Sequence, residues 1–257
     1  MKSTIALLLV ATATLAATLP HPHTTPSHTE GSEVAPAIDT TFLAHWTATT
    51  VISEAQATQV GLKRLFTANA IDAATAQRMK GKSYRTDCRI PLTDLRLLHV
   101  AHRNANGQTQ LGEIVCHKRI AEKLLRIFSQ LYQANYRIER IRLIDDYDAD
   151  DERAMTDNNT SCFCYREVAG SQKLSKHSQG LAVDINTLYN PCVANRQGRQ
   201  TVQPQAGRPY AFRRDQRQDI PYKIDHNDLA YKLFRAEGFT WGGDWRTVKD
   251  YQHFEYN

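Results

Sequence analysis

The strongest constraint on the fold is a pair of strand-like segments joined by a tight turn. Residues 94–101 (DLRLLHVA) and 108–115 (QTQLGEIV) contain the apolar and β-branched residues typical of strands. Between them, Asn104-Ala105-Asn106-Gly107 supplies residue types that tolerate the left-handed backbone of a hairpin turn. The sequence therefore predicts an antiparallel β-hairpin here.

Helix and strand patterns surround this hairpin. Residues 118–132 repeat apolar side chains every three to four positions, which predicts an amphipathic helix, and the Ala-rich residues 52–79 are also compatible with helices. Residues 138–144 and 181–186 alternate in the manner of strands. The acidic segment 145–152 is expected to be a solvated loop, since it lacks the Gly and final Glu of an EF-hand. This order predicts an α+β fold with a mostly antiparallel central sheet flanked by helices.

The composition is that of a soluble globular protein. The 257 residues include 32 Lys and Arg against 27 Asp and Glu, so the formal net charge is +5, and 41% of the residues are hydrophobic. The basic residues are spread along the chain without a long run. We therefore expect no nucleic-acid partner, and the charge is equally compatible with a polyanionic surface such as a cell wall.

The N-terminus has the pattern of a secretion signal. A short basic start, Met1-Lys2-Ser3, precedes an apolar stretch that ends in small residues near Ala16 and Ala17. We therefore expect a signal peptide over residues 1–17 and a protein that is not stably inserted in a membrane after cleavage. An uncleaved anchor is the alternative.

Two further segments precede the region that carries the chemistry. Residues 18–40 hold four of the nine prolines, so residues 18–50 are expected to form a linker or tether. Residues 51–84 are expected to form a helical N-terminal extension.

Five cysteines, an odd number, are compatible with an oxidising compartment. Cys162-Phe163-Cys164 lacks the spacing of a C-x-x-C redox or zinc motif. The cysteines are interpreted as structural, with room for one or two disulfides of open connectivity.

The residues suited to chemistry lie in the last hundred positions. The strand pattern of 181–186 places Asp184 on the face opposite Leu181, Val183 and Ile185, and His177 precedes it by seven positions. A second pair, Asp250 and His253, lies near the C-terminus. Two histidines and one aspartate form a three-ligand site with an open fourth position, as in a catalytic zinc centre.

These motifs resemble the D-alanyl-D-alanine carboxypeptidase family of zinc peptidases. That family is related to vancomycin-resistance dipeptidases, to phage endolysin L-Ala-D-Glu endopeptidases and to the hedgehog fold. The resemblance rests on S-x-H-x-x-G-x-A-x-D at 175–184, W-G-G-D-W at 241–245 and D-x-x-H at 250–253. It implies a hedgehog/DD-peptidase-like fold and a zinc peptidase catalytic domain over residues 85–257. Many carboxypeptidases have Glu where this chain has Asp250, whereas the endopeptidase branch has Asp.

The resemblance also implies a role for each site residue. His177, Asp184 and His253 would hold Zn²⁺, and Asp250 would act as the general base. Arg166 would be catalytic as well, pairing with the polarised carbonyl oxygen or with a substrate carboxylate. Substrate binding is assigned to Ser175, Ser161 and Arg166. Glu255 is the alternative base.

The function that follows is hydrolysis of peptidoglycan stem peptides by an exported zinc metallopeptidase, acting as a D-Ala-D-Ala carboxypeptidase. An L-Ala-D-Glu endopeptidase is the alternative within the enzyme class, and a non-catalytic zinc-containing wall-binding module is the alternative outside it. Retention of Asp250 beside all three ligands favours the enzyme. We expect a monomer in the periplasm or outside the cell, at a bacterial envelope.

Overall fold

A computed structural model describes residues 38–168, 172–196 and 198–257. The predicted signal peptide and residues 18–37 of the predicted linker lie outside the described residues. No helix in the described ranges is long and apolar enough to cross a membrane.

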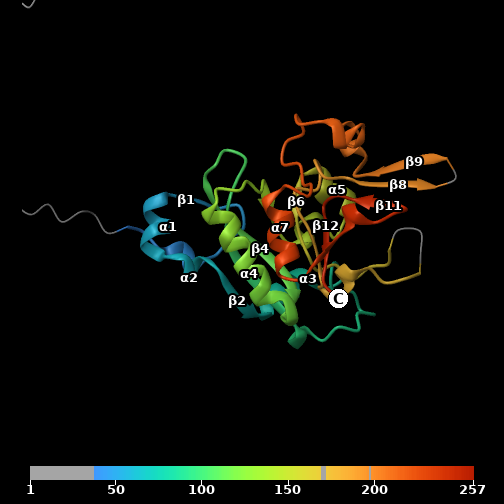
Figure 1. Ribbon diagram of the computed structural model, residues 1–257. Coiled ribbons are helices and arrows are strands. Elements are labelled where there is room, and N and C mark those ends of the chain that lie inside the picture. The colour runs from blue at the N-terminus through green and yellow to red at the C-terminus, as the bar shows by residue number, and fades with distance from the viewer. Residues whose placement is uncertain (1–37, 169–171, 197) are drawn as a thin grey trace, which may run out of the picture. The chain divides into compact units, whose positions relative to one another are not determined.

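Seven α-helices and twelve strands occur in the part of the chain that the structure describes (Figure 1). The helices are α1 (Glu54–Val60), α2 (Leu62–Leu65), α3 (Ala73–Met79), α4 (Lys118–Gln133), α5 (Asp151–Thr156), α6 (Arg208–Ala211) and α7 (Leu229–Ala236). The strands are β1 (Val51–Ile52), β2 (Thr67–Ala70), β3 (Leu95–Arg103), β4 (Thr109–His117), β5 (Arg140–Ile141), β6 (Asn159–Thr160), β7 (Ala182–Asp184), β8 (Cys192–Arg196), β9 (Arg199–Gln203), β10 (Thr240–Trp241), β11 (Val248–Asp250) and β12 (His253–Glu255).

The α+β class is confirmed, but the strands form four small sheets instead of one central sheet. The strand orders are β1-β4-β3-β2, β10-β12-β7, β11-β8-β9 and β5-β6. Among these described strands, only β5 and β6 pair in parallel. Strands β7, β11 and β12 are three residues long and hydrogen-bond within their own small sheets, so they do not extend the long hairpin. The hedgehog/DD-peptidase-like fold stays a prediction.

The predicted hairpin and the helix after it are confirmed. Strands β3 and β4 pair along nine residues, from Leu95 opposite His117 to Arg103 opposite Thr109. Gly107 has φ +79°, and the side chain of Asn104 accepts hydrogen bonds from two backbone N–H groups of the turn. Helix α4 packs on this hairpin, and α7 lies beside α4 (Figure 1).

The N-terminal extension is only partly helical. Strands β1 and β2 pair with β4 and β3, so residues 51–84 share a sheet with the hairpin. Part of the predicted linker also belongs to the fold, because Trp46 stacks on His99 with ring centroids 4.5 Å apart. The sequence of β2, Thr-Ala-Asn-Ala, has little strand propensity, and the edge of β3 sets its conformation.

One hydrophobic core joins the hairpin layer to the strands that carry the candidate site. It includes side chains of β3, β4 and α4 together with Leu181, Val183 and Ile185, as their alternation predicts. Phe254 on β12 stacks on Phe234 of α7, with centroids 4.3 Å apart. The sheet β10-β12-β7, which carries Asp184 and His253, therefore packs one face against the main core.

Two local expectations are wrong. The strand predicted over 138–144 is limited to Arg140 and Ile141. The acidic segment 145–152 is not a solvated loop, because it forms the 3-10 helix η3 (Ile144–Tyr147) and the start of α5. Asp145 is buried and accepts hydrogen bonds from the backbone N–H and hydroxyl of Ser83.

Cys88, Cys116, Cys162 and Cys164 are thiols without disulfides. Three of these are buried among apolar residues, and burial raises the pKa of the Cys164 thiol to about 12. Burial of Cys116, Cys162 and Cys164 agrees with the structural interpretation, and the structure joins none of these four cysteines in a disulfide.

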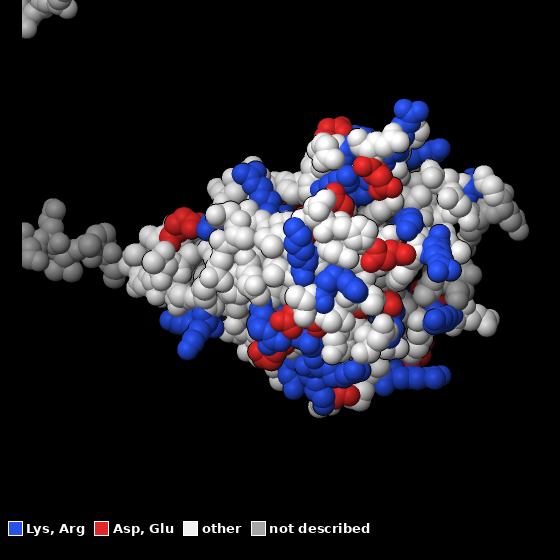
Figure 2. Space-filling view, viewed as in Figure 1, with Lys and Arg blue, Asp and Glu red and all other residues white. Residues whose placement is uncertain are grey.

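Charged side chains are mixed on the surface. On the face shown in Figure 2, Lys and Arg occur throughout with Asp and Glu between them. This distribution matches the spread of basic residues along the sequence.

Replacing Val183 by aspartate is expected to unfold the domain. The side chain of Val183 is fully buried, and a carboxylate placed there would have no partner. Asp184→Asn, on the other face of the same strand, should leave the protein folded and lower its metal content. Circular dichroism melts of both variants test this, and a cooperative native-like melt for Val183→Asp would contradict the packing.

Candidate metal centre

Two short antiparallel strands bring Asp184 and His253 together. In the register of β7 and β12, these residues are direct cross-strand partners, and Val183 faces Phe254 on the core side. Because side chains alternate along strands, Asp184 and His253 both point away from the core. The motif at 175–184 and the motif at 250–253 are far apart in sequence and meet at this pair of strands.

A 3-10 helix, η4 (Lys176–Gln179), places His177 beside them. Its N-cap residue, Ser175, accepts a hydrogen bond from the His177 N–H. Gly180 ends η4 with φ +65°, and a Cβ there would lie 2.6 Å from the backbone nitrogen of His117. The glycine of the first motif is thus required by both its conformation and its packing.

The three predicted ligands form one compact cluster. His177 Nε2 lies 3.1 Å from Asp184 Oδ2 and 3.2 Å from His253 Nδ1, and His253 Nδ1 lies 3.0 Å from Asp184 Oδ1. The edges of a tetrahedron with zinc–ligand bonds near 2.0–2.1 Å are roughly 3.3 Å long. In the described ranges, no other group of three such side chains converges in this way.

Outer partners orient both imidazoles. His177 Nδ1 lies 2.6 Å from the carbonyl oxygen of Cys162, so an Nδ1–H would leave Nε2 as the ligand atom. His253 Nε2 lies 3.3 Å from Glu255 Oε2, so Glu255 orients this ring. The sequence indicated Glu255 only as an alternative base.

The electrostatics of the cluster favour a cation. Burial opposes ionisation of Asp184, but His177 and His253 hold its pKa well below the usual value. Burial also opposes a charge on His253, yet hydrogen bonds to Asp184 and Glu255 raise its pKa to about 10. A cluster that attracts a proton so strongly also suits a divalent metal ion, and its two nitrogens and one carboxylate suit zinc.

Asp250 lies next to the cluster without joining it. It ends β11, and its Oδ1 atom is buried without a hydrogen-bond partner. Burial raises the pKa of this carboxyl to about 6, although His253 opposes the shift. A carboxylate with a free lone pair beside a metal site suits a general base.

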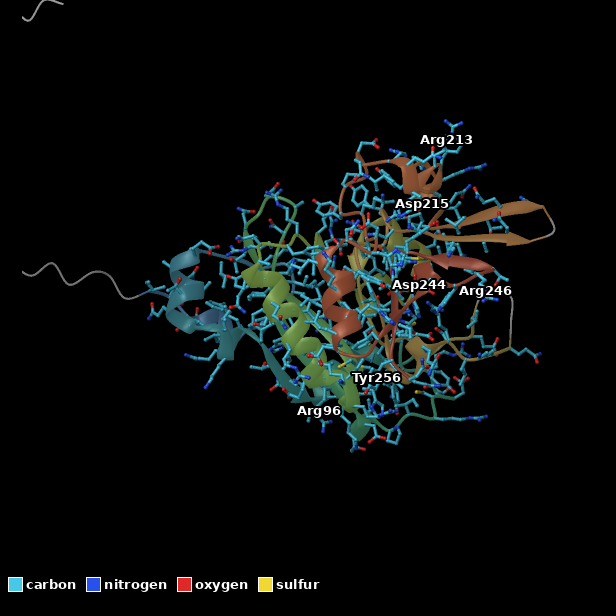
Figure 3. The ribbon with its side chains drawn as sticks, in the orientation of Figure 1. Arg96, Arg213, Asp215, Asp244, Arg246 and Tyr256 are labelled. Atoms are coloured by element: carbon cyan, nitrogen blue, oxygen red, sulfur yellow. The ribbon has the colours of Figure 1, made fainter. Side chains whose placement is uncertain are left out.

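The W-G-G-D-W motif at 241–245 allows Asp250 and His253 to pack closely against it. A Cβ at Gly242 would lie 2.6 Å from the carbonyl oxygen and 2.8 Å from the Cβ of Asp250, and 3.2 Å from the Cβ of His253. Asp244 and Arg246 of the same region are exposed and outside the ligand cluster (Figure 3).

Gly242→Ala is therefore expected to weaken metal binding by on the order of 10- to 100-fold, the range seen when groups that orient ligands are lost. Titration with zinc and a competing chelator measures this. Gly81→Ala is the control, because nothing lies within 4 Å of the missing Cβ of Gly81. An unchanged zinc affinity in Gly242→Ala would contradict the packing argument.

Residues 169–256 match a family model described as D-alanyl-D-alanine carboxypeptidase. The resemblance to this family is confirmed. The matched segment, residues 169–256, contains the His-Asp-His cluster and Asp250. Searches of curated proteins and of solved structures found no significant match.

Ser161 and Arg166 precede the segment that matches the carboxypeptidase family, and the structure places both near the site. Ser161 pairs through its backbone with Asp184, in two hydrogen bonds of 3.0 and 3.2 Å. The backbone of Arg166 bonds to Ser175 and Ser178 of the turn that carries His177.

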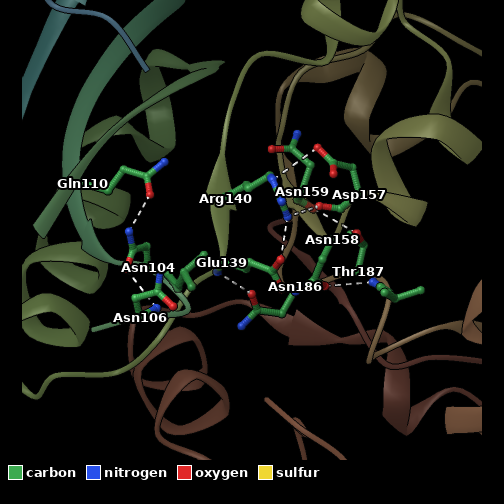
Figure 4. A network of polar contacts seen from close by, with 12 residues as sticks. Asn104, Asn106, Gln110, Glu139, Arg140, Asp157, Asn158, Asn159, Asn186 and Thr187 are labelled. Atoms are coloured by element: carbon green, nitrogen blue, oxygen red, sulfur yellow. Dashed lines mark hydrogen bonds and ion pairs between the residues drawn. The ribbon is translucent and has the colours of Figure 1, made fainter. Parts of the chain in front are cut away.

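A polar network fixes the loop that leads to Ser161 (Figure 4). Asn158 and Asn159 are buried, and Asn158 donates to Glu139 and accepts from the backbone N–H of Leu188. The hydroxyl of Thr187 donates to the carbonyl oxygen of Asn159. These bonds join the loop to the segment after β7, so Ser161 is held in register with Asp184.

One charged residue of the site was missed. Asp151, at the start of α5, forms an ion pair with Arg166. The charges of His177 and Asp184 also influence its pKa, which burial raises. Nothing in the acidic segment distinguishes Asp151 from its neighbours, and only the tertiary structure reveals this contact.

Proposed function

We propose that this protein is a zinc peptidase that cleaves peptidoglycan stem peptides, acting as a D-Ala-D-Ala carboxypeptidase. The observation that carries the proposal is a His-Asp-His cluster beside a carboxylate whose buried Oδ1 atom has no hydrogen-bond partner, inside the segment that matches the family. The family match supports a peptidase, and the donor set supports zinc.

In this proposal His177, Asp184 and His253 hold the ion. Zinc, when bound, acts as a Lewis acid that polarises a carbonyl and lowers the pKa of water. Asp250 takes a proton from the attacking water at Oδ1 and returns it to the leaving amine. Arg166 donates N–H groups to the carbonyl oxygen, whose charge grows during attack.

A second candidate is an L-Ala-D-Glu endopeptidase, which the shorter carboxylate Asp250 favours. Incubating the zinc-loaded protein with a pentapeptide stem and measuring product masses separates the two. Loss of one terminal alanine supports the carboxypeptidase, and cleavage inside the stem supports the endopeptidase. An intact peptide, with zinc bound, would contradict both and favour a non-catalytic wall-binding module.

The proposal includes export, with residues 1–17 as a cleaved signal peptide, and action as a monomer in the periplasm or outside the cell. Expression in a bacterium followed by N-terminal sequencing of the exported protein tests the cleavage. Light scattering of the purified protein tests the monomer.

A further inference from the structure

The guanidinium of Arg166 is already paired. Its partner, Asp151, is the first residue of α5, and each side chain is about one-third exposed, at 30% and 33%. The pair is thus partly withdrawn from water, where an ion pair interacts more strongly than at an open surface, yet a ligand can still reach it. Asp184 lies near enough to influence both charges, and His177 influences that of Asp151.

Arg166 and Asp151 both lie in segments whose backbone groups form hydrogen bonds with residues close to the His-Asp-His cluster. The N–H of Arg166 donates to the Ser178 hydroxyl at 2.9 Å, and its carbonyl accepts from the Ser175 N–H at 3.1 Å. On the other side, the carbonyl of Met155 in α5 accepts from the Thr187 hydroxyl, just after β7. The contact therefore joins two segments that are each fixed to the metal centre.

This pairing affects what Arg166 can bind. A substrate carboxylate is bound best by a cation without a counter-ion, and here it would also meet the negative charge of Asp151. A neutral peptide carbonyl needs only N–H donors, and it carries no full charge for Asp151 to repel. The sequence left two substrate groups open as the partner of Arg166, a carbonyl oxygen and a carboxylate. The ion pair with Asp151 favours the carbonyl oxygen.

We propose that Asp151 is a specificity-determining residue, which neutralises Arg166 so that this side of the site accepts a peptide carbonyl in preference to a carboxylate. This inference rests on the proposed peptidase function. It deepens that function by assigning the terminal carboxylate of a substrate to a position away from Arg166.

The test uses two peptides that differ only in a C-terminal carboxylate or carboxamide. For zinc-loaded Asp151→Asn, the ratio of kcat/KM for the carboxylate peptide to that for the amide should rise about fivefold, which corresponds to ~1 kcal/mol, because hydrogen bonds to an ionised group are stronger than neutral ones by about that amount. A ratio taken on one preparation does not depend on the fraction of active protein. Asp151→Glu, which keeps the charge, should restore the wild-type ratio.

Asp150→Asn is the matched control. It removes the same charge one position earlier, from the exposed N-cap of the same helix, where Asn is an equally good cap. Its ratio should equal that of wild type. If Asp151→Asn folds poorly, Asp151→Ser provides the same comparison.

An unchanged ratio in Asp151→Asn, with both rates reduced equally, would overturn the inference and make Asp151 purely structural. If the wild-type protein cleaves neither peptide, the proposed function fails, and calorimetric binding of the same two peptides still tests the inference. In that case the affinity ratio of carboxylate to amide should rise in Asp151→Asn, and equal ratios would overturn it.

Discussion

Replacing His177 by alanine is expected to remove the metal and the peptidase activity together. His177 Nε2 lies 3.2 Å from His253 Nδ1 and 3.1 Å from Asp184 Oδ2, and its ring is already oriented by the Cys162 carbonyl. Alanine leaves only two ligands and an unpaired carbonyl next to a buried space. Two protein ligands are fewer than the three of catalytic zinc sites, so zinc should be lost on dialysis.

Elemental analysis by mass spectrometry measures this, with about one zinc per chain expected for the wild-type protein. His45→Ala is the control, because His45 is exposed and outside the cluster. Glu255→Gln should give an intermediate result, a 10- to 100-fold loss of zinc affinity, because Glu255 orients His253 from behind. Full zinc occupancy in His177→Ala would refute the ligand assignment.

Local sequence patterns predicted those helices and strands that are specified by their own residues. The β3–β4 hairpin follows from its turn residues, and α4 follows from its apolar stripe. The alternation around Asp184 predicted which side chains enter the core and which face the site. Each of these signals is contained within about 20 residues of sequence.

The elements that were missed depend on contacts between distant segments. Strand β2 has a sequence of low strand propensity and is paired through the edge of β3. Helix α5 is only six residues long, and its packing against the segment after β7 brings Asp151 to Arg166. The separation into small sheets also depends on tertiary packing, because a strand pattern does not specify its partner.

In the candidate site, too, some residues could be predicted from local sequence and others depend on contacts between distant segments. The three candidate ligands could be located from the sequence because they belong to motifs with fixed spacing, and the structure brings all three side chains together. The groups that orient them could not be predicted. One is a backbone carbonyl, that of Cys162, which no residue type indicates, and another is Glu255, which the sequence indicated only as the alternative to Asp250 as the base.

Replacing Asp250 by alanine is expected to separate base from ligand. Asp250 is outside the His-Asp-His cluster, and its buried Oδ1 has no hydrogen-bond partner to lose. Alanine keeps the Cβ that packs on Gly242, so His253 should stay in place. The variant should therefore keep its zinc and its KM while kcat falls on the order of 10²–10⁴-fold, the usual contribution of a general base.

Zinc content and turnover of Asp250→Ala should be measured on the same preparation as those of Glu255→Gln. The two variants are expected to fail in opposite ways. Asp250→Ala should bind zinc and turn over slowly, whereas Glu255→Gln should bind zinc more weakly and recover most of its rate when zinc is in excess. If Asp250→Ala turns over normally and Glu255→Gln stays inactive with zinc bound, Glu255 is the base, and the hydrogen bond between its Oε2 and His253 Nε2 must break during the reaction.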